Sequence, residues 1–117
     1  QSFSLLGLVF QREAVEMTGR YELVAICFNR KGQVLSIGRN SYTKTHPLQA
    51  YFAKRVGHPY KHFLHAEIDA ILKARGKPID KIQVIRYDRH GKPANAKPCP
   101  ICQEAIKAFG IKHIVHT

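Results

Sequence analysis

Two short motifs contain the residue types and the spacing that a catalytic metal site requires. His65 and Glu67 stand in the segment HAE, and Cys99 and Cys102 stand further along the chain in PCPIC. One imidazole and two thiolates are typical zinc ligands, and three protein ligands leave one position of the ion open for water. The remaining carboxylate, Glu67, can act as a base beside that water. The pattern predicts one zinc ion per chain and the hydrolytic removal of an amino group from a nucleobase.

Each motif by itself has an ordinary explanation. A lone CxxC occurs in redox pairs and as half of a zinc ribbon, and a lone HxE often has no function. A ribbon requires a second cysteine pair, which this chain lacks. A thioredoxin-type pair leaves the HAE segment unexplained. The two motifs together are therefore specific, and we take His65, Cys99 and Cys102 as the metal ligands and Glu67 as the catalytic residue.

Both motifs are predicted at the start of a helix. Apolar residues recur at helical spacing over residues 65–74, and Pro98 opens a second helix that ends at Gly110. Unpaired N–H groups and the positive end of the helix dipole stabilise thiolates at such positions. Cys99 and Cys102 are three residues apart, so their sulfurs share one face of the second helix. His65 then supplies the third ligand from the first helix.

The remaining segments predict a mixed sheet covered by helices. The order is helix, two strands, helix, strand, helix, strand, with a further short helix between the second strand and the HAE helix. We expect helices over residues 5–17 and 48–55, and strands over residues 21–28, 33–38, 81–88 and 111–116. The first two strands form a hairpin around a glycine-containing turn. Without a repeat or linker, residues 1–117 form a single α/β domain.

The charge of the chain favours a polyanionic partner. Lys and Arg total 19 against 8 Asp and Glu, a formal net charge of +11. Between the second strand and the HAE helix, aromatic residues alternate with basic ones, a composition typical of a polynucleotide track. We therefore expect nucleic acid as partner, with single- or double-stranded DNA favoured. The residues of this aromatic and basic segment are Tyr42, Lys44, His46, Tyr51, Lys54, Arg55, Tyr60, Lys61 and His62.

Cysteine use and hydropathy indicate the compartment. Three cysteines, two of them in one CxxC, do not make a disulfide framework, so a reducing, cytoplasmic environment is expected. No apolar run has the length of a membrane span, and no membrane partner is predicted. The first residue, Gln1, is typical of a domain excised from a longer protein, such as a phage or toxin protein. No oligomeric state is predicted.

From residue 21 to the C-terminus, the sequence resembles the zinc-dependent cytidine/deoxycytidylate deaminase superfamily. Its signature, [H/C]-x-E followed by P-C-x-x-C, is matched by His65, Glu67, Pro98, Cys99 and Cys102. The resemblance implies a three-layer α/β/α sandwich with a mixed sheet, here in a minimal form with about four strands. It also implies a zinc ion and Glu67 as proton shuttle. Family members usually continue with another helix and a fifth strand, a substrate-defining region that we expect to be missing.

The resemblance predicts deamination of cytosine to uracil. Glu67 takes a proton from zinc-bound water and passes it to N3 of the pyrimidine, while hydroxide attacks C4 and ammonia leaves. Asn40 resembles the family asparagine that contacts the sugar or base, although a turn-forming role is an equal alternative. In α/β proteins, ligands bind at the carboxyl ends of the strands. We therefore expect a substrate contact from the residues at the end of the 81–88 strand, among Arg86, Tyr87, Arg89 and His90. The predicted substrate-binding residues are Asn40, Tyr60, His62, Ala66, Tyr87 and Pro98.

Cytosine within nucleic acid, DNA before RNA, is the favoured substrate because of the charge. Three alternatives stay open. A free deoxycytidylate deaminase fits the segments HAEIDAIL and PCPIC, but one phosphate leaves most of the positive charge unexplained. A tRNA adenosine deaminase also carries HAE with PCxxC. A catalytically silent, zinc-stabilised nucleic-acid-binding module is disfavoured because a structural site has no use for Glu67.

Overall fold

A computed structural model describes residues 23–117, which form a mixed four-stranded sheet and three helices. The predicted helix over residues 5–17 and the first residues of the predicted strand over 21–28 lie outside this range. No helix within it has the length and apolar content needed to cross a membrane. In chain order, the elements are β1 (Leu23–Phe28), β2 (Val34–Arg39), α2 (Pro47–Arg55), α3 (Ala66–Lys73), β3 (Lys81–Arg86), α4 (Pro100–Ala108) and β4 (His113–His116).

The sheet has the strand order β2-β1-β3-β4. β1 is antiparallel to β2 and to β3, whereas β4 is parallel to β3 because α4 forms the crossover between them. Leu23 pairs with Arg86 at one end of the central strand pair, and Phe28 pairs with Lys81 at the other end. The predicted hairpin and mixed sheet are confirmed. We call the Leu23 and Arg86 end the cleft edge and the Phe28 and Lys81 end the distal edge.

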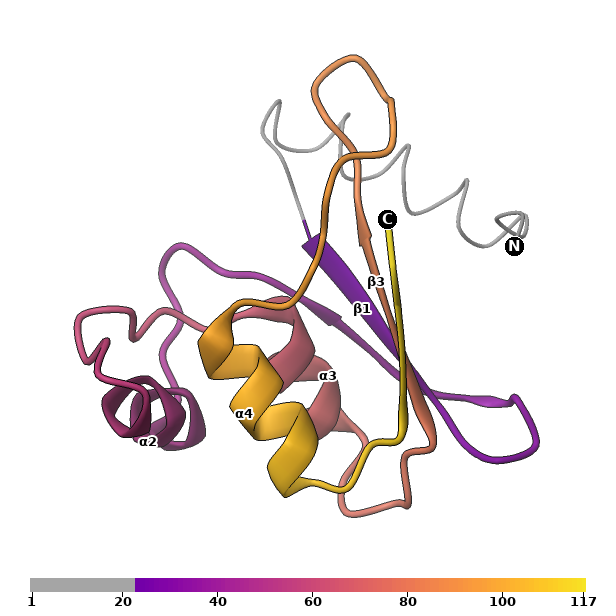
Figure 1. Cartoon of the computed structure of the whole chain (residues 1–117), viewed down its shortest axis with the longest axis horizontal. Coiled ribbons are helices and arrows are strands. Elements are labelled where there is room, and N and C mark those ends of the chain that lie inside the picture. The colour runs from indigo at the N-terminus through magenta and orange to yellow at the C-terminus, as the bar shows by residue number, and fades with distance from the viewer. Residues whose placement is uncertain (1–22) are drawn as a thin grey trace.

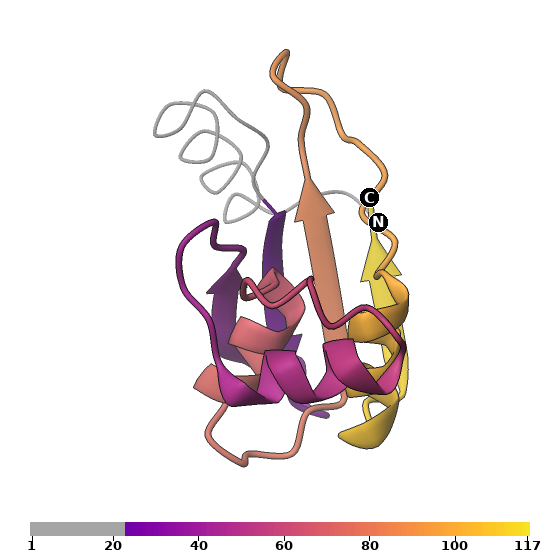
Figure 2. The ribbon, with the colours of Figure 1, turned by 90° about the vertical axis from the view of Figure 1, so that its left-hand side faces the viewer.

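The three helices described here all lie on one face of the sheet (Figure 2). Side chains alternate along a strand, so Ala25 and Cys27 of β1 join the core beneath the helices. Val24 and Ile26 point to the opposite face, where they form a second buried cluster. The α/β class with a mixed sheet is therefore confirmed, and residues 23–117 provide two of the three predicted layers.

Several segments end at the cleft edge (Figure 1). β2, β3 and β4 all finish there, because β2 and β3 are both antiparallel to β1 and β4 is parallel to β3. The N-termini of α3 and α4 also lie at this edge, because their N-caps, His65 and Cys99, line one pocket together with Leu23 and Arg86. The start of a helix and the end of a strand both leave backbone groups unpaired, and this is where α/β proteins form their sites.

Gly38 allows β2 and α3 to pack closely. A Cβ atom at this position would collide with the carbonyl oxygen of Ala66 and the backbone nitrogen of Ala70, and would lie 2.8 Å from the Ala70 Cα atom. Ser36, two residues earlier on the same face, donates a 2.7 Å hydrogen bond to the Ala70 carbonyl. The backbone of β2 therefore sets the position of α3 and of the motif at its start.

Candidate metal centre and substrate cleft

The starts of α3 and α4 bring the three predicted metal ligands together. His65 is the N-cap of α3, Cys99 is the N-cap of α4, and Cys102 lies in the first turn of α4. The predicted helix start at Pro98 therefore shifts to Pro100, whose fixed φ suits the first helical position. His65 Nδ1 lies 3.2 Å from Cys102 Sγ and 3.4 Å from Cys99 Sγ, and all ligand atoms lie within 4.8 Å of one another. One imidazole and two thiols at this spacing fit a tetrahedral zinc ion with one open position.

Hydrogen bonds within the cluster favour a thiolate at Cys99. A hydrogen bond from the Cys102 thiol, and a weaker contribution from His65, lower the pKa of Cys99 to about 4. The same contact with Cys99 raises the pKa of His65, and contact with Cys99 together with burial raises the pKa of Cys102. Zinc binds cysteine as thiolate, so the site holds one ligand in the required form at neutral pH.

Glu67 lies beside the ligands and is almost fully buried, with 3% of its surface exposed. Its Oε1 atom has no hydrogen-bond partner among the residues that the structure describes. Burial raises the pKa of this carboxyl. A buried carboxylate oxygen without a partner is costly, and it is explained when the site exists to bind another group. The carboxylate therefore fits a metal centre that handles a proton.

Gln49 supports the metal site from α2, and sequence reasoning missed it. The side chain is fully buried; Oε1 accepts a 3.1 Å hydrogen bond from the His65 N–H, and Nε2 donates a 3.2 Å bond to the Lys61 carbonyl. One carboxamide thus joins α2 to the residue that begins α3. The available signal was a glutamine at a position that faces the core in the helix HPLQAYFAK, where an apolar residue is usual.

A cleft of about 480 Å³ opens beside the metal centre. His65, Glu67 and Cys99 form its floor, so a substrate in the cleft meets the ligands and the carboxylate together. The walls come from the start of β1, the end of β2, the segment before α3, the end of β3 and the segment before α4. These wall residues are Leu23, Asn40, Ser41, Tyr42, Tyr60, Lys61, Phe63, Leu64, Arg86, Asn95, Ala96 and Lys97.

Asn40 and Tyr60, two of the predicted substrate-binding residues, line this cleft. Asn40 Oδ1 accepts a 2.9 Å hydrogen bond from the Leu23 N–H, so the amide nitrogen is the group that it offers to a substrate. Tyr60 is 67% exposed, and its hydroxyl contacts His58 Nδ1 at 3.2 Å. Both alternatives for Asn40, a structural role and a place in the site, are thus compatible with its position.

Ala66 and Pro98 adjoin the metal ligands without lining the cleft. Ala66 is fully buried at the first position of α3. Pro98 is buried, and its carbonyl accepts a 2.7 Å hydrogen bond from Gln103 Nε2. Both residues therefore hold the starts of the two helices in place, and their predicted contact with the substrate is not reflected in the cleft wall.

His62 and Tyr87 do not line the cleft, so their contact with a substrate stays a prediction. His62 is exposed and packs against the Phe63 ring, with the ring centroids 4.7 Å apart. Tyr87 is 5% exposed and belongs to the apolar cluster on the face opposite the helices. Because side chains alternate along β3, Arg86 faces the cleft and Tyr87 the other side. The predicted strand end fell two residues beyond Arg86, and the sequence could not tell which of the two neighbours faces the cleft.

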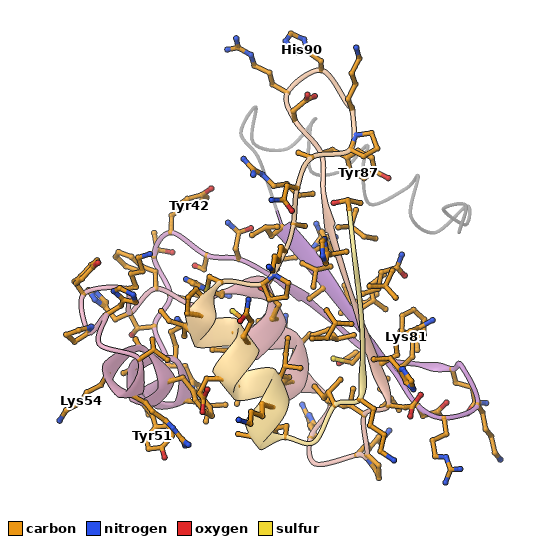
Figure 3. The ribbon with its side chains drawn as sticks, in the orientation of Figure 1. Tyr42, Tyr51, Lys54, Lys81, Tyr87 and His90 are labelled. Atoms are coloured by element: carbon orange, nitrogen blue, oxygen red, sulfur yellow. The ribbon has the colours of Figure 1, made fainter. Side chains whose placement is uncertain are left out.

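The aromatic and basic segment does not form a continuous track. Tyr42, Tyr60 and Lys61 line the cleft. α2 instead places Tyr51 and Lys54 on its outer side, away from Tyr42 (Figure 3). Further members of the segment have structural partners: His46 Nδ1 caps α2 by accepting from the Leu48 N–H at 3.0 Å, and Arg55 pairs with Glu104 at 3.3 Å. The helical period of α2 is the physical reason for the division.

Residues that follow β3 were missed as parts of the wall. Asn95, Ala96 and Lys97 line the cleft just before Cys99, and Ala96 is held by a 2.9 Å hydrogen bond from its N–H to the Thr117 carbonyl. Lys61, Arg86 and Lys97 place three cations in the walls. The only signal in the sequence was that residues 95–97 precede the metal motif, which by itself does not indicate where they point.

Comparison with known proteins agrees with this geometry. The sequence model of the cytidine and deoxycytidylate deaminase zinc-binding region matches residues 3–117. No curated protein sequence matches the chain significantly. Among solved structures, the fold is similar to that of a mutant cytidine deaminase from Mycobacterium tuberculosis, with a TM-score of 0.52 and 16% identity. This match covers 92% of the chain and 80% of the mycobacterial protein, and at this identity it supports the fold alone.

Proposed function

The chain belongs to the cytidine and deoxycytidylate deaminase zinc-binding family, and we propose that it deaminates cytosine within a polynucleotide, DNA before RNA. The observation that carries the reaction is the cluster of His65, Cys99 and Cys102 with the Glu67 carboxylate beside it, whose Oε1 atom has no partner among the described residues. This is the set of groups that hydrolytic deamination requires: three metal ligands, an open position and a base.

Each group of the metal centre has a defined part in the reaction. Zinc, when held by His65, Cys99 and Cys102, supplies the Lewis acidity that makes water nucleophilic at neutral pH. Glu67 accepts a proton from the attacking water and delivers it to N3 of the ring as the C4–O bond forms. Glu67 then transfers the second water proton to the amino group, the C4–N bond breaks, and ammonia leaves. Cytosine and water become uracil and ammonia.

The walls of the cleft are suited to a pyrimidine nucleotide. Tyr60 and Phe63 are 67% and 43% exposed, and both line the cleft, where a base can stack on an aromatic face. Asn40 offers its amide nitrogen as a donor to a sugar or base oxygen. A base that enters the cleft must be unpaired, so single-stranded DNA is the expected form of the substrate.

The cations of the cleft support a phosphate-bearing substrate. Lys61, Arg86 and Lys97 come from three different wall segments. Cations placed on several walls can contact successive phosphates of a strand, and the remaining positive charge of the chain attracts a polyanion over a longer range. One observation favours the second candidate, free deoxycytidylate: these three cations are also sufficient for a single phosphate group.

A substrate panel tests the proposal. The zinc-loaded protein is incubated with single-stranded DNA, duplex DNA, RNA, deoxycytidylate and cytidine, and uracil and inosine are measured by mass spectrometry. We expect uracil from single-stranded DNA at the highest kcat/KM, with a steep loss of rate as salt is raised. Turnover of deoxycytidylate alone, with no product from any polynucleotide, would contradict the proposal and support the second candidate. Inosine from RNA would identify an adenosine deaminase.

A further inference from the structure

A hairpin-like extension follows β3 and projects from the body of the domain (Figure 1). It comprises residues 87–94, and we call it the β3–α4 arm. Tyr87 pairs with Pro93 at its base, and a tight turn over residues 88–92 forms its tip. His90 lies at this tip, at the far end from the helices (Figure 3).

The tip of the arm is held in one conformation by its own hydrogen bonds. Asp88 Oδ1 accepts from the His90 N–H at 2.8 Å and from the Lys92 N–H at 3.0 Å. The Asp88 N–H donates to the Lys92 carbonyl at 2.8 Å, and Gly91 adopts the positive φ of 77° that the turn requires. The arm therefore presents its side chains without the ordering cost of a flexible loop.

The arm rises from the wall of the substrate cleft. Arg86 precedes it and Asn95 to Lys97 follow it, and these residues line the cleft. Arg86 Nη1 donates to the Asn95 carbonyl at 3.3 Å, and this bond joins the segments that enter and leave the arm at its base. At about 3.3 Å per extended residue, the tip lies roughly 10 Å beyond Arg86. A substrate must extend well outside the cleft to contact it.

The exposed groups at the tip are basic. Arg89, His90 and Lys92 are all exposed, and the ion pairs found within residues 23–117 use other side chains. The one acidic group, Asp88, is engaged by backbone N–H groups of the turn, and the hydrogen bond from Lys92 is the main reason for its lowered pKa. The tip thus offers flexible cationic side chains on a fixed backbone.

We propose that the β3–α4 arm grips the phosphodiester backbone of a single-stranded polynucleotide whose target base lies in the cleft. Arg89 and Lys92 contact phosphates outside the cleft, while Lys61, Arg86 and Lys97 contact those near the target base. This inference rests on the proposed function and deepens it, because a mononucleotide in the cleft is too short to reach the tip. The arm would therefore select a polymer over a monomer through length.

The chain contains its own control for this proposal. The turn between β1 and β2 has the sequence NRKGQ, against DRHGK at the tip of the arm, and it lies at the distal edge (Figure 1). Arg30 and Lys31 of that turn are exposed as Arg89 and Lys92 are. Arg89→Ser with Lys92→Ser and Arg30→Ser with Lys31→Ser thus remove the same charge from the same kind of turn.

The binding experiment uses zinc-loaded Glu67→Gln protein, so that the oligonucleotide is not converted. Fluorescence anisotropy measures the affinity for single-stranded oligonucleotides of roughly 3 to 16 nucleotides. Two lost phosphate contacts should reduce the slope of log affinity against log salt by roughly 1.4 in the arm variant. The ratio of parent to arm-variant affinity should rise with oligonucleotide length. The distal variant should keep the parent slope, because its charges are remote from the bound strand.

Equal losses in the arm and distal variants at every length would overturn the role of the arm, since the effect would then come from overall charge. Failure of the parent to bind any oligonucleotide would overturn it as well. Binding that depends on the arm without deamination of any oligonucleotide by the active protein would contradict the proposed function alone. The two proposals therefore fail in distinguishable ways.

Discussion

Two turns of the same structure lie at opposite edges of the sheet. In the distal turn over residues 29–33, Asn29 Oδ1 accepts from the N–H groups of Lys31 at 3.0 Å and Gln33 at 2.9 Å. In the arm, the turn over residues 88–92 repeats these bonds from Asp88, and a glycine at positive φ occupies the same position in both turns. Both expose basic side chains, yet only the arm borders the cleft. Local sequence decides the turn, and its place in the fold decides what the turn can contact.

The carboxylates of α3 show the same contrast over a shorter distance. Asp69 Oδ2 accepts from the Arg39 N–H at 3.0 Å and from Lys73 Nζ at 2.8 Å, so its charge stabilises the packing of α3 on β2. Glu67, two residues nearer the cleft edge, keeps one oxygen unpartnered. The Asp69 carboxylate is thus satisfied within the fold, whereas the Glu67 carboxylate keeps an oxygen for a ligand.

Replacing each carboxylate by its amide should separate these two roles most strongly. Glu67→Gln should lower kcat by roughly 10²- to 10⁴-fold, because proton transfer is lost while the shape is kept. Asp69→Asn keeps an acceptor for the Arg39 N–H and should retain activity close to the parent. The measurement is uracil formation with zinc content determined in parallel. A Glu67→Gln protein that is active, or one without zinc, would contradict the assigned role.

Gly38→Ala should be the most damaging of the packing changes. The added methyl group collides with the backbone of α3, so we expect a loss of about 3 kcal/mol in the free energy of unfolding and weaker zinc binding as α3 moves. Gly32→Ala in the distal turn has open space but a φ of 78°, and should cost about 1 kcal/mol through backbone strain. Denaturant unfolding and zinc titration measure both effects. Equal zinc affinity in the two variants would contradict the link between β2 and the metal centre.

Gln49→Leu and Ser36→Ala compare a buried hydrogen bond at the metal centre with one remote from it. Gln49→Leu leaves the His65 N–H without its partner, at about 1–3 kcal/mol of stability, whereas Ser36→Ala should cost only about 1 kcal/mol because the Ala70 carbonyl also accepts from the Ala74 N–H at 3.0 Å. Gln49→Leu should in addition weaken zinc binding about tenfold, because the His65 backbone loses its support. Ser36→Ala should leave zinc affinity unchanged, since Ser36 contacts the Ala70 carbonyl. Competition with a chelator gives the zinc affinities of the two variants. Equal zinc affinities would contradict a role of Gln49 in metal binding and would show that it only stabilises the fold.

The smallest expected effect distinguishes the two turns by pH. The fold lowers the pKa of Asp88, so its hydrogen bonds stabilise the arm above the ordinary carboxyl pKa and are lost as pH falls through the lowered value. Asn29 does not ionise, and the distal turn should not respond. In an acid titration followed by NMR, the Lys92 amide should shift while the Gln33 amide stays constant. A common shift in both turns would indicate general unfolding instead.

Most of the architecture could be predicted from local patterns. The hairpin, the helix over residues 48–55 and the two motif helices were placed within a few residues, because apolar periodicity and turn residues act over short stretches of chain. Strand ends were less certain: β3 was predicted to reach Asp88 but ends at Arg86, since Asp88 begins the turn of the arm. The side of the sheet that Tyr87 faces could not be predicted either, because it depends on the register of the strand end.

The spacing of HAE and PCPIC by itself determined the metal ligands and the class of reaction, because ligand chemistry depends on residue type and on helical spacing. The tertiary structure decided which other residues surround them. The pairing of β1 with β2 and with β3 brings Asn40 and Arg86 to one edge, where Lys97 lines the same cleft. The period of α2 buries Gln49 while it turns Tyr51 outward. The tertiary structure also places two nearly identical turns, residues 29–33 and 88–92, at opposite edges of the sheet. Long-range strand pairing is not written in any short segment, so only the folded chain shows which basic turn stands beside the cleft.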